Sequence, residues 1–134
     1  MGDTMKTILV PVSVGELADK LSILHIKSER IGDPDKRRHV RLELEVLRPI
    51  WDRLVAANPA LAAEYERLKA VNERMWDVQD ALREHEAARR FDDGFIRLAR
   101  SVAVHNGERV AIKNAINRQS GSAFIEEKQY STGA

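Results

Sequence analysis

Cysteine is absent from this sequence of 134 residues, and its absence removes several classes of chemistry. Without a thiol, the chain forms no disulfide bond, offers no cysteine nucleophile and builds no cysteine-ligated zinc or iron–sulfur site. The glycine-rich loops that bind phosphate groups are missing too, as is the G-x-S-x-G motif of hydrolases. The sequence therefore contains none of these common motifs that identify a reaction.

An excess of charge of one sign is also lacking. Lys and Arg total 22 and Asp and Glu total 21, so the net charge is +1. A protein that coats nucleic acid needs a clear basic excess. The two tryptophans, Trp51 and Trp76, are not interleaved with basic residues and are predicted to be core or interface anchors. We therefore expect no nucleic-acid partner.

Long hydrophobic runs are missing as well. No apolar stretch exceeds five residues, the length of Ile8–Val12, whereas a transmembrane helix needs about 20. We therefore expect no membrane span, no secretory signal and a cytoplasmic location. With 43% hydrophobic residues, a chain of this length can fill the core of one domain.

Histidine-based chemistry has little support. His25 and Glu29, like His39 and Glu43, are four residues apart and can share a helix face. The Glu-x-x-His motifs of helical di-metal sites do not occur, so we predict no metal site and no cofactor. An acid–base role for His25 or His105 is left open beside the simpler interpretation, a hydrogen-bonded, half-buried histidine.

The sequence does contain a strong helical pattern. It predicts an all-α fold: a single domain like a four-helix bundle, with a kinked second helix and short extended arms at both ends. Ser13 and Glu16 form a capping box, because each side chain can bond the other residue's amide. The first helix is therefore predicted over residues 14–31, with Gly32 ending it.

Two cap-plus-proline signals predict the next two helices. The dipeptide Asp33-Pro34 predicts a helix over residues 34–57, which Pro49 should kink. The dipeptide Asn58-Pro59 predicts another over residues 59–90. This third helix has an apolar residue at every seventh position, as a coiled coil does, and such a seam would let the chain dimerise or dock a partner enzyme. The seam consists of Leu61, Leu68, Met75 and Leu82.

The last helix is predicted over residues 95–119, after a turn at residues 92–94, and Gly121 ends it. The β-branched run of residues 7–12 predicts an extended arm over residues 1–12, which Pro11 restricts to a sheet edge or to a terminal arm. Residues 121–134 are predicted to be an extended tail that can pair with this arm.

Polar residues occupy the inward face of the last helix where apolar ones belong. Phe95, Ala99 and Val102 define that face, and it continues into four polar positions. Buried amides and ammonium groups are costly unless they are paired. Carboxylates from another helix can satisfy them, or an anionic ligand can, or the helix phase differs and the stripe is exposed. The four positions are Asn106, Arg109, Lys113 and Asn117.

The first helix has a related set of polar residues. They can form an internal ion pair with snorkelling lysines, or they can line the other wall of a polar pocket. If the first and last helices are antiparallel neighbours, Asp19 and Lys20 approach Lys113 and Asn117. The candidate ligand-binding residues of this helix are Asp19, Lys20, Lys27 and Arg30.

A basic run, residues 36–39 with Arg41, lies in the first turns of the second helix. The helix dipole disfavours positive charge there, so the run can hold phosphates or an acidic membrane surface. The simpler interpretation is a solvated stretch that Asp33 and Asp35 offset.

Two segments together resemble a known family. The first is Gly15–Leu24 with residues 27–31; the second contains the polar stripe of the last helix, followed by Gly121-Ser122 and residues 126–130. The chain resembles, over nearly its whole length, a family of short bacterial proteins of unknown function. Some members accompany glycosyltransferases and cell-surface polysaccharide genes. The resemblance therefore implies a link to glycan or lipopolysaccharide assembly, without an established activity.

The leading hypothesis is a binding or accessory domain for a phosphorylated or carboxylated metabolite. Arg109 and Lys113 would be the counter-charges, and Asn106 and Asn117 would orient the ligand. One alternative is the helical interaction module described above. The other is a small-molecule isomerase or lyase with Asp19 and Lys113 as acid and base.

Overall fold

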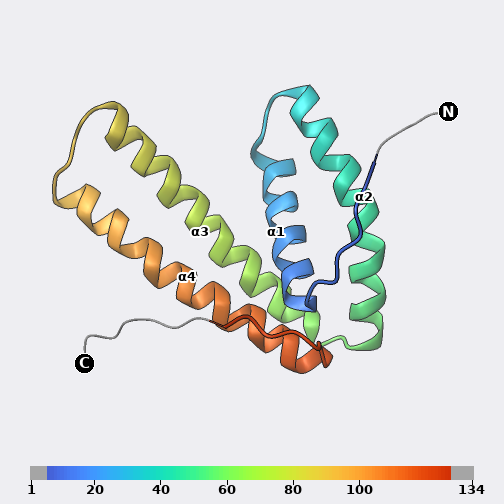
Figure 1. Cartoon of the computed structure of the whole chain (residues 1–134). Helices are drawn as coiled ribbons and strands as arrows, with labels where there is room; N and C mark the ends of the chain where they lie inside the picture. The colour runs from blue at the N-terminus through green and yellow to red at the C-terminus, as the bar shows by residue number, and fades with distance from the viewer. Residues whose placement is uncertain (1–5, 128–134) are drawn as a thin grey trace, which may run out of the picture.

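A computed structural model describes residues 6–127, and within that range it contains four α-helices and no strand (Figure 1). The predicted all-α class is confirmed. The helices form two hairpins, α1–α2 and α3–α4, which meet at one end and diverge at the other. No helix in this range is long and apolar enough to cross a membrane. The helices are α1 Val14–Arg30, α2 Pro34–Ala57, α3 Leu61–Ala87 and α4 Asp93–Ser120.

The capping box at the start of α1 is formed on one side: the Ser13 side chain accepts a hydrogen bond from the Glu16 amide at 3.0 Å. The predicted end of this helix is one residue late, and Gly32 is not a left-handed cap. The connection to α2 consists of residues 31–33 alone. The backbone is already extended at Ile31, so α1 ends at Arg30.

The bounds of α2 match the prediction, and the Asp33 side chain caps it by accepting from the amides of Asp35 and Lys36. The helix continues through Pro49 and changes direction along its length (Figure 1). At its start, Arg38 pairs with Asp35 at 2.9 Å on the exposed surface, which fits a solvated basic stretch.

The predicted bounds of α3 were wrong at both ends. Asn58 does not cap this helix, because its side-chain amide donates to the Gln119 carbonyl of α4 at 3.0 Å. The cap position is Ala60, which forms no side-chain cap bond. The helix ends at Ala87, since Arg89 adopts the left-handed conformation with φ of 51°.

The predicted start of α4 was two residues late. The Asp92 side chain accepts from the Phe95 amide at 3.0 Å, so Asp93 and Gly94 belong to the first helical turn. The end confirms the glycine signal: the helix stops at Ser120, and Gly121 is left-handed with φ of 70°.

The predicted pairing of the two extended arms was wrong for the part of the tail that the structure describes. Asn114 of α4 binds the tail instead: its amide nitrogen donates to the Glu126 carbonyl at 2.8 Å, and its oxygen accepts from the Glu126 amide at 2.9 Å. One side chain thus supplies both bonds that a second strand would offer. Residues 128–130 of the predicted pairing lie outside the described residues.

The hydrophobic core lies where the two hairpins meet. Leu61 and Leu68 are fully buried there, and Trp51 is also in the core. The seam prediction is therefore wrong for Leu61 and Leu68, since they pack within their own chain. Met75 and Leu82 are half-buried farther along α3.

Candidate functional site

A polar network lies where α1, α3 and α4 meet, with Asp19 at its centre. Asp19 is 4% exposed, and its carboxylate accepts hydrogen bonds from Arg109 at 2.9 Å (Nε) and 2.5 Å (Nη2). It also accepts from the Asn72 amide of α3 at 3.0 Å, and Asn72 donates to Ser22 at 2.8 Å. Asp19 therefore joins three helices through charged and amide partners.

Lys113 is the second charged centre of this network. The residue is only 3% exposed, and three carboxylates surround its ammonium group. The Nζ atom lies 2.6 Å from Glu16 Oε1, 2.6 Å from Glu126 Oε1 and 3.9 Å from Asp19 Oδ2. The carboxylates come from α1 and from the tail, so Lys113 ties both segments to α4.

The beginning of α1 sits directly against the end of α4. The Asn117 oxygen accepts a hydrogen bond from the Gly15 amide at 2.7 Å, and the Asn117 amide nitrogen donates to Asn114 at 3.3 Å. A Cβ atom at Gly15 would overlap the Lys113 carbonyl and lie 2.9 Å from Asn117 Oδ1. Glycine is therefore required here by a close approach between helices.

The network keeps its charged groups ionised. Burial alone would raise the pKa of Asp19, but hydrogen bonds from Arg109 and Asn72 outweigh it, and that pKa lies below its ordinary value. Burial alone would lower the pKa of Lys113, but Glu126 and Glu16 outweigh it, and that pKa is raised. The hydrogen bond to Asp19 likewise raises the pKa of Arg109.

The structure brings four of the predicted residues together: Asp19, Arg109, Lys113 and Asn117. Asn106 lies at the edge of the network, where its oxygen is 3.5 Å from Arg109 Nη1. The predicted antiparallel approach of the first and last helices is present. Asp19 contacts Arg109, whereas Gly15, which is earlier in α1, contacts Asn117, which is later in α4. Carboxylates from other segments, rather than solvent, satisfy the buried cations.

The other predicted residues of α1 lie elsewhere. Lys20 turns toward α2 and pairs with Glu43 at 2.7 Å on the exposed surface. Arg30 pairs with Asp77 of α3 at 2.5 Å. Lys27 is half-buried and is not part of the network. The expected approach of Lys20 to Lys113 was therefore wrong, because its position on the helix points it to the other hairpin.

Several members of the network were missed by sequence reasoning. Glu16 was assigned only to the capping box and Glu126 only to an extended tail. Asn72 follows Val71 on the buried face of α3, so its place in the helical period was a usable signal. No comparable signal marks Asn114 or Glu126, because their contact is set by the path of the tail.

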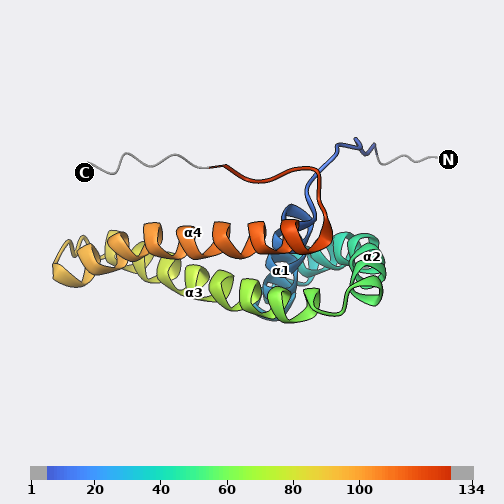
Figure 2. The same cartoon turned by 90° about the horizontal axis from the view of Figure 1, so that it is seen from below.

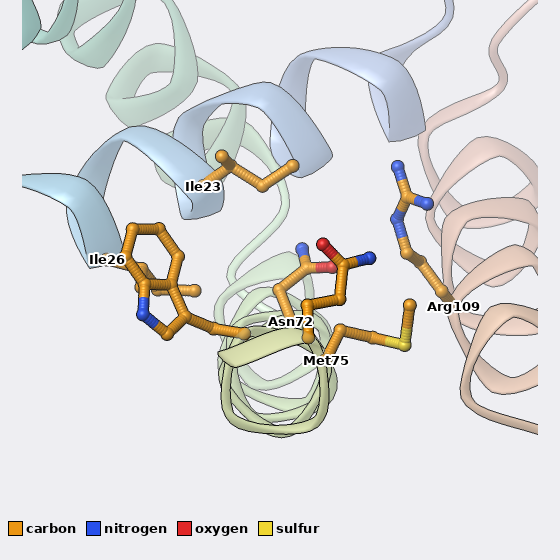
Figure 3. Close-up of a pocket in the computed structure, with 7 residues that line it drawn as sticks. Ile23, Ile26, Asn72, Met75 and Arg109 are labelled. Atoms are coloured by element: carbon orange, nitrogen blue, oxygen red, sulfur yellow. The ribbon is translucent and has the colours of Figure 1, made fainter. Parts of the chain in front are cut away.

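Beside the network lies a groove of about 180 Å³. In Figure 3, Ile23 and Ile26 of α1 face Asn72 and Met75 of α3 across it, with Arg109 of α4 to one side. The Arg30 guanidinium lies 5.8 Å from the centre of the Trp76 ring, which is also part of the lining. The lining residues are Ile23, Ile26, Asn72, Met75, Trp76, Gln79 and Arg109.

The histidines do not join this site. The His25 ring bonds the Tyr65 hydroxyl, and burial lowers the pKa of His25, so its neutral form is favoured. His105 is half-buried with its Nδ1 3.5 Å from Glu108. Within residues 6–127, no three His, Asp or Glu side chains converge as metal ligands.

The fold and the network define an all-helical domain of two hairpins with a charged, internally paired polar centre. The chain belongs to the family of unknown function DUF6165, whose profile matches residues 8–134. The resemblance noted from the sequence is therefore confirmed at the level of the family. No curated protein and no solved structure matches the chain.

Proposed function

We propose that this chain is a binding domain that holds a small phosphorylated or carboxylated metabolite in the groove between α1, α3 and α4. The observation that carries the proposal is the state of Arg109. Asp19 holds its Nε and Nη2 atoms, whereas among residues 6–127 the Nη1 atom has only the 3.5 Å contact with Asn106. The side chain is 30% exposed and lines the groove. A pre-positioned guanidinium edge suits phosphate or carboxylate oxygens.

The rest of the groove supports a ligand with an apolar or ring-shaped part. Trp76 and Met75 offer apolar surface, while the side-chain amide of Gln79 and the side-chain oxygen of Asn72 offer hydrogen bonds. The volume of about 180 Å³ is below the roughly 300–1,000 Å³ of sites for drug-sized ligands. A sugar phosphate or a small dicarboxylate is therefore favoured over a larger compound.

In this proposal Lys113 and Asn117 act behind the groove rather than on the ligand. Lys113 is buried among three carboxylates, and Asn117 holds the Gly15 amide. They position α1 and, through Asp19, the Arg109 guanidinium. Arg30 lies beside the groove, against the ring of Trp76, and Lys27 follows the lining residue Ile26 in the sequence.

The setting we propose is the cytoplasm and glycan or lipopolysaccharide biosynthesis, as the family resemblance implies. An isomerase or lyase has less support. The pKa of Asp19 is lowered and that of Lys113 is raised, so both pKa values move away from neutral pH. An efficient acid–base pair needs pKa values close to it.

A ligand screen with a tryptophan readout tests the proposal. Sugar phosphates and dicarboxylates are expected to raise the melting temperature and change the Trp76 fluorescence, while Trp51 stays buried in the core. The Trp76→Phe variant should lose the fluorescence change, and Arg109→Lys should weaken binding. Lys20→Met, on the far side of α1, should bind as the wild type does. The proposal fails if no compound moves either signal.

A further inference from the structure

The N-terminal arm, residues 6–12, is an apolar segment that the other described residues of the chain leave uncovered. Ile8 is 84% exposed and Leu9 is 95% exposed, and Val10 and Val12 are also exposed. This arm includes one of the longest apolar stretches of the sequence, and the family profile begins within it, at residue 8. The arm is therefore part of the family domain rather than an addition to it.

A second groove, distinct from the proposed ligand site, lies at the base of this arm. It has a volume of about 390 Å³ and separates the arm from the tail. Figure 2 shows the arm and the tail leaving the same face of the molecule in opposite directions. Because its lining residues Val12, Phe124 and Ile125 are exposed, the groove is open to an outside segment. Its lining residues are Pro11, Val12, Ser13, Glu16, Phe124, Ile125 and Glu126.

We propose that this face is a homodimer interface in which each copy receives the arm of the other. The two arms would pair antiparallel about a twofold axis, and apolar side chains of one arm would enter the groove of the other copy. The groove offers apolar contacts from Val12, Phe124 and Ile125, which are themselves exposed. An isologous contact of this kind closes on itself as a dimer.

Charge complementarity favours a second copy as the occupant. The arm carries Lys6 and no acidic residue from residue 6 to residue 12, whereas Glu16 and Glu126 border the groove and share one close cation, Lys113, which offsets only one of their two charges. With Val10 opposite Val10 of the second copy, Lys6 of one arm comes opposite the start of α1 of the other, next to Glu16. The protein's net charge of +1 adds little repulsion between copies.

The position of Pro11 explains why the pairing would stop at two arms. In an extended segment, successive amides point to opposite edges. The edge with the amides of Ile8, Val10 and Val12 is complete, while the other edge lacks a donor at Pro11. The complete edges pair with each other, and the incomplete edges face solvent and resist further strand addition.

Sedimentation velocity of the full chain over a range of concentrations tests the dimer. The wild type should dimerise, and Val10→Pro should raise the dimer dissociation constant at least about ten-fold, because it removes a paired amide. Leu42→Asp on α2 is the matched control, since Leu42 is also exposed, at 50%, but lies on another element. The melting temperature of dilute Val10→Pro should equal that of the wild type.

Amide exchange provides a second readout. In the dimer, the amides of Ile8, Val10 and Val12 should be protected and that of Leu9 should not. A monomer at all concentrations overturns the proposal, as does a dimer that survives Val10→Pro. Dissociation by Leu42→Asp alone would place the interface on α2 and also overturn it. The arm lies outside the groove that Arg109 lines, so either result leaves the proposed ligand site to its own test.

Discussion

Lys113 is almost fully buried, and its charge is stable only because carboxylates from two other segments surround it. Glu16 and Glu126 each lie 2.6 Å from its ammonium nitrogen. An isolated charge at this depth would cost several kcal/mol, so the three side chains depend on one another. The same lysine holds both α1 and the tail against α4. Its loss should therefore destabilise the contacts of both segments.

Replacing Lys113 by methionine should therefore lower the free energy of unfolding by about 1.5–3 kcal/mol, because the buried Asp19 and the partly exposed Glu16 and Glu126 lose a shared charged partner. Lys20→Met is the matched control. Its ion pair with Glu43 is exposed on both sides, and such pairs contribute about 0–1 kcal/mol. Urea unfolding of the two variants measures both values. Equal losses would contradict a structural role for the buried pair.

The ionisation of Asp19 should make stability depend on pH in the acidic range. Its pKa in the folded protein is below the ordinary value of 3.8. The contribution of the carboxylate is therefore fully present above that ordinary value, and it is lost as pH falls through the lowered pKa. Unfolding free energies of the wild type and Asp19→Asn, measured from neutral to acidic pH, should converge at the acidic end. A constant difference between them would contradict this assignment.

Between elements, the contact of α1 with α4 depends on a glycine. A methyl group at Gly15 would overlap the backbone of α4, so Gly15→Ala should destabilise the protein by about 1–3 kcal/mol. Gly107 lies within α4 with open space where a Cβ would stand, and Gly107→Ala should stabilise by about 0.5–1 kcal/mol. Thermal or urea unfolding of the two variants checks the opposite signs. A neutral Gly15→Ala would mean that the helices separate at little cost.

At the scale of the whole molecule, the described part of the tail, residues 121–127, is attached to the helices through Glu126 and, at its start, through Ser122, whose hydroxyl oxygen accepts from the Val14 amide at 3.3 Å. The Asn114 side chain bonds both the amide and the carbonyl of Glu126, and Lys113 pairs with the Glu126 carboxylate. Phe124 and Ile125, in contrast, are exposed. The Asn114→Ala variant should therefore release the tail while the four helices remain folded.

Amide exchange and limited proteolysis measure that release. In Asn114→Ala, the Glu126 amide should lose its protection and cleavage within residues 121–127 should accelerate. Ser120→Ala is the control, because Ser120 is half-buried nearby but bonds only carbonyls of its own helix. If the tail stays protected in Asn114→Ala, Lys113 and the bonds of Ser122 are sufficient to hold it.

The helices themselves were predictable because their signals are local. Apolar spacing, the cap at Ser13, the Asp33-Pro34 start and Gly121 all act within a few residues, and each appears at the expected place. The phase of α4 also placed Arg109, Lys113 and Asn117 toward other helices. Boundaries failed at the end of α1, at both ends of α3 and at the start of α4. At Asn58 the reason is a partner distant in sequence, because its side chain bonds Gln119 of α4 instead of capping α3.

The partners of those inward residues were not predictable, because they are distant in sequence. Asp19 meets Arg109 across 90 positions, and Lys113 meets Glu16 across 97. Helical periodicity states which face a side chain occupies, but it does not state what covers that face. Which hairpin packs on which, and where the tail crosses α4, depends on the core shared by all four helices. Local propensity thus specified the helices, whereas the packing of the two hairpins selected the charge pairs, the grooves and the uncovered arm.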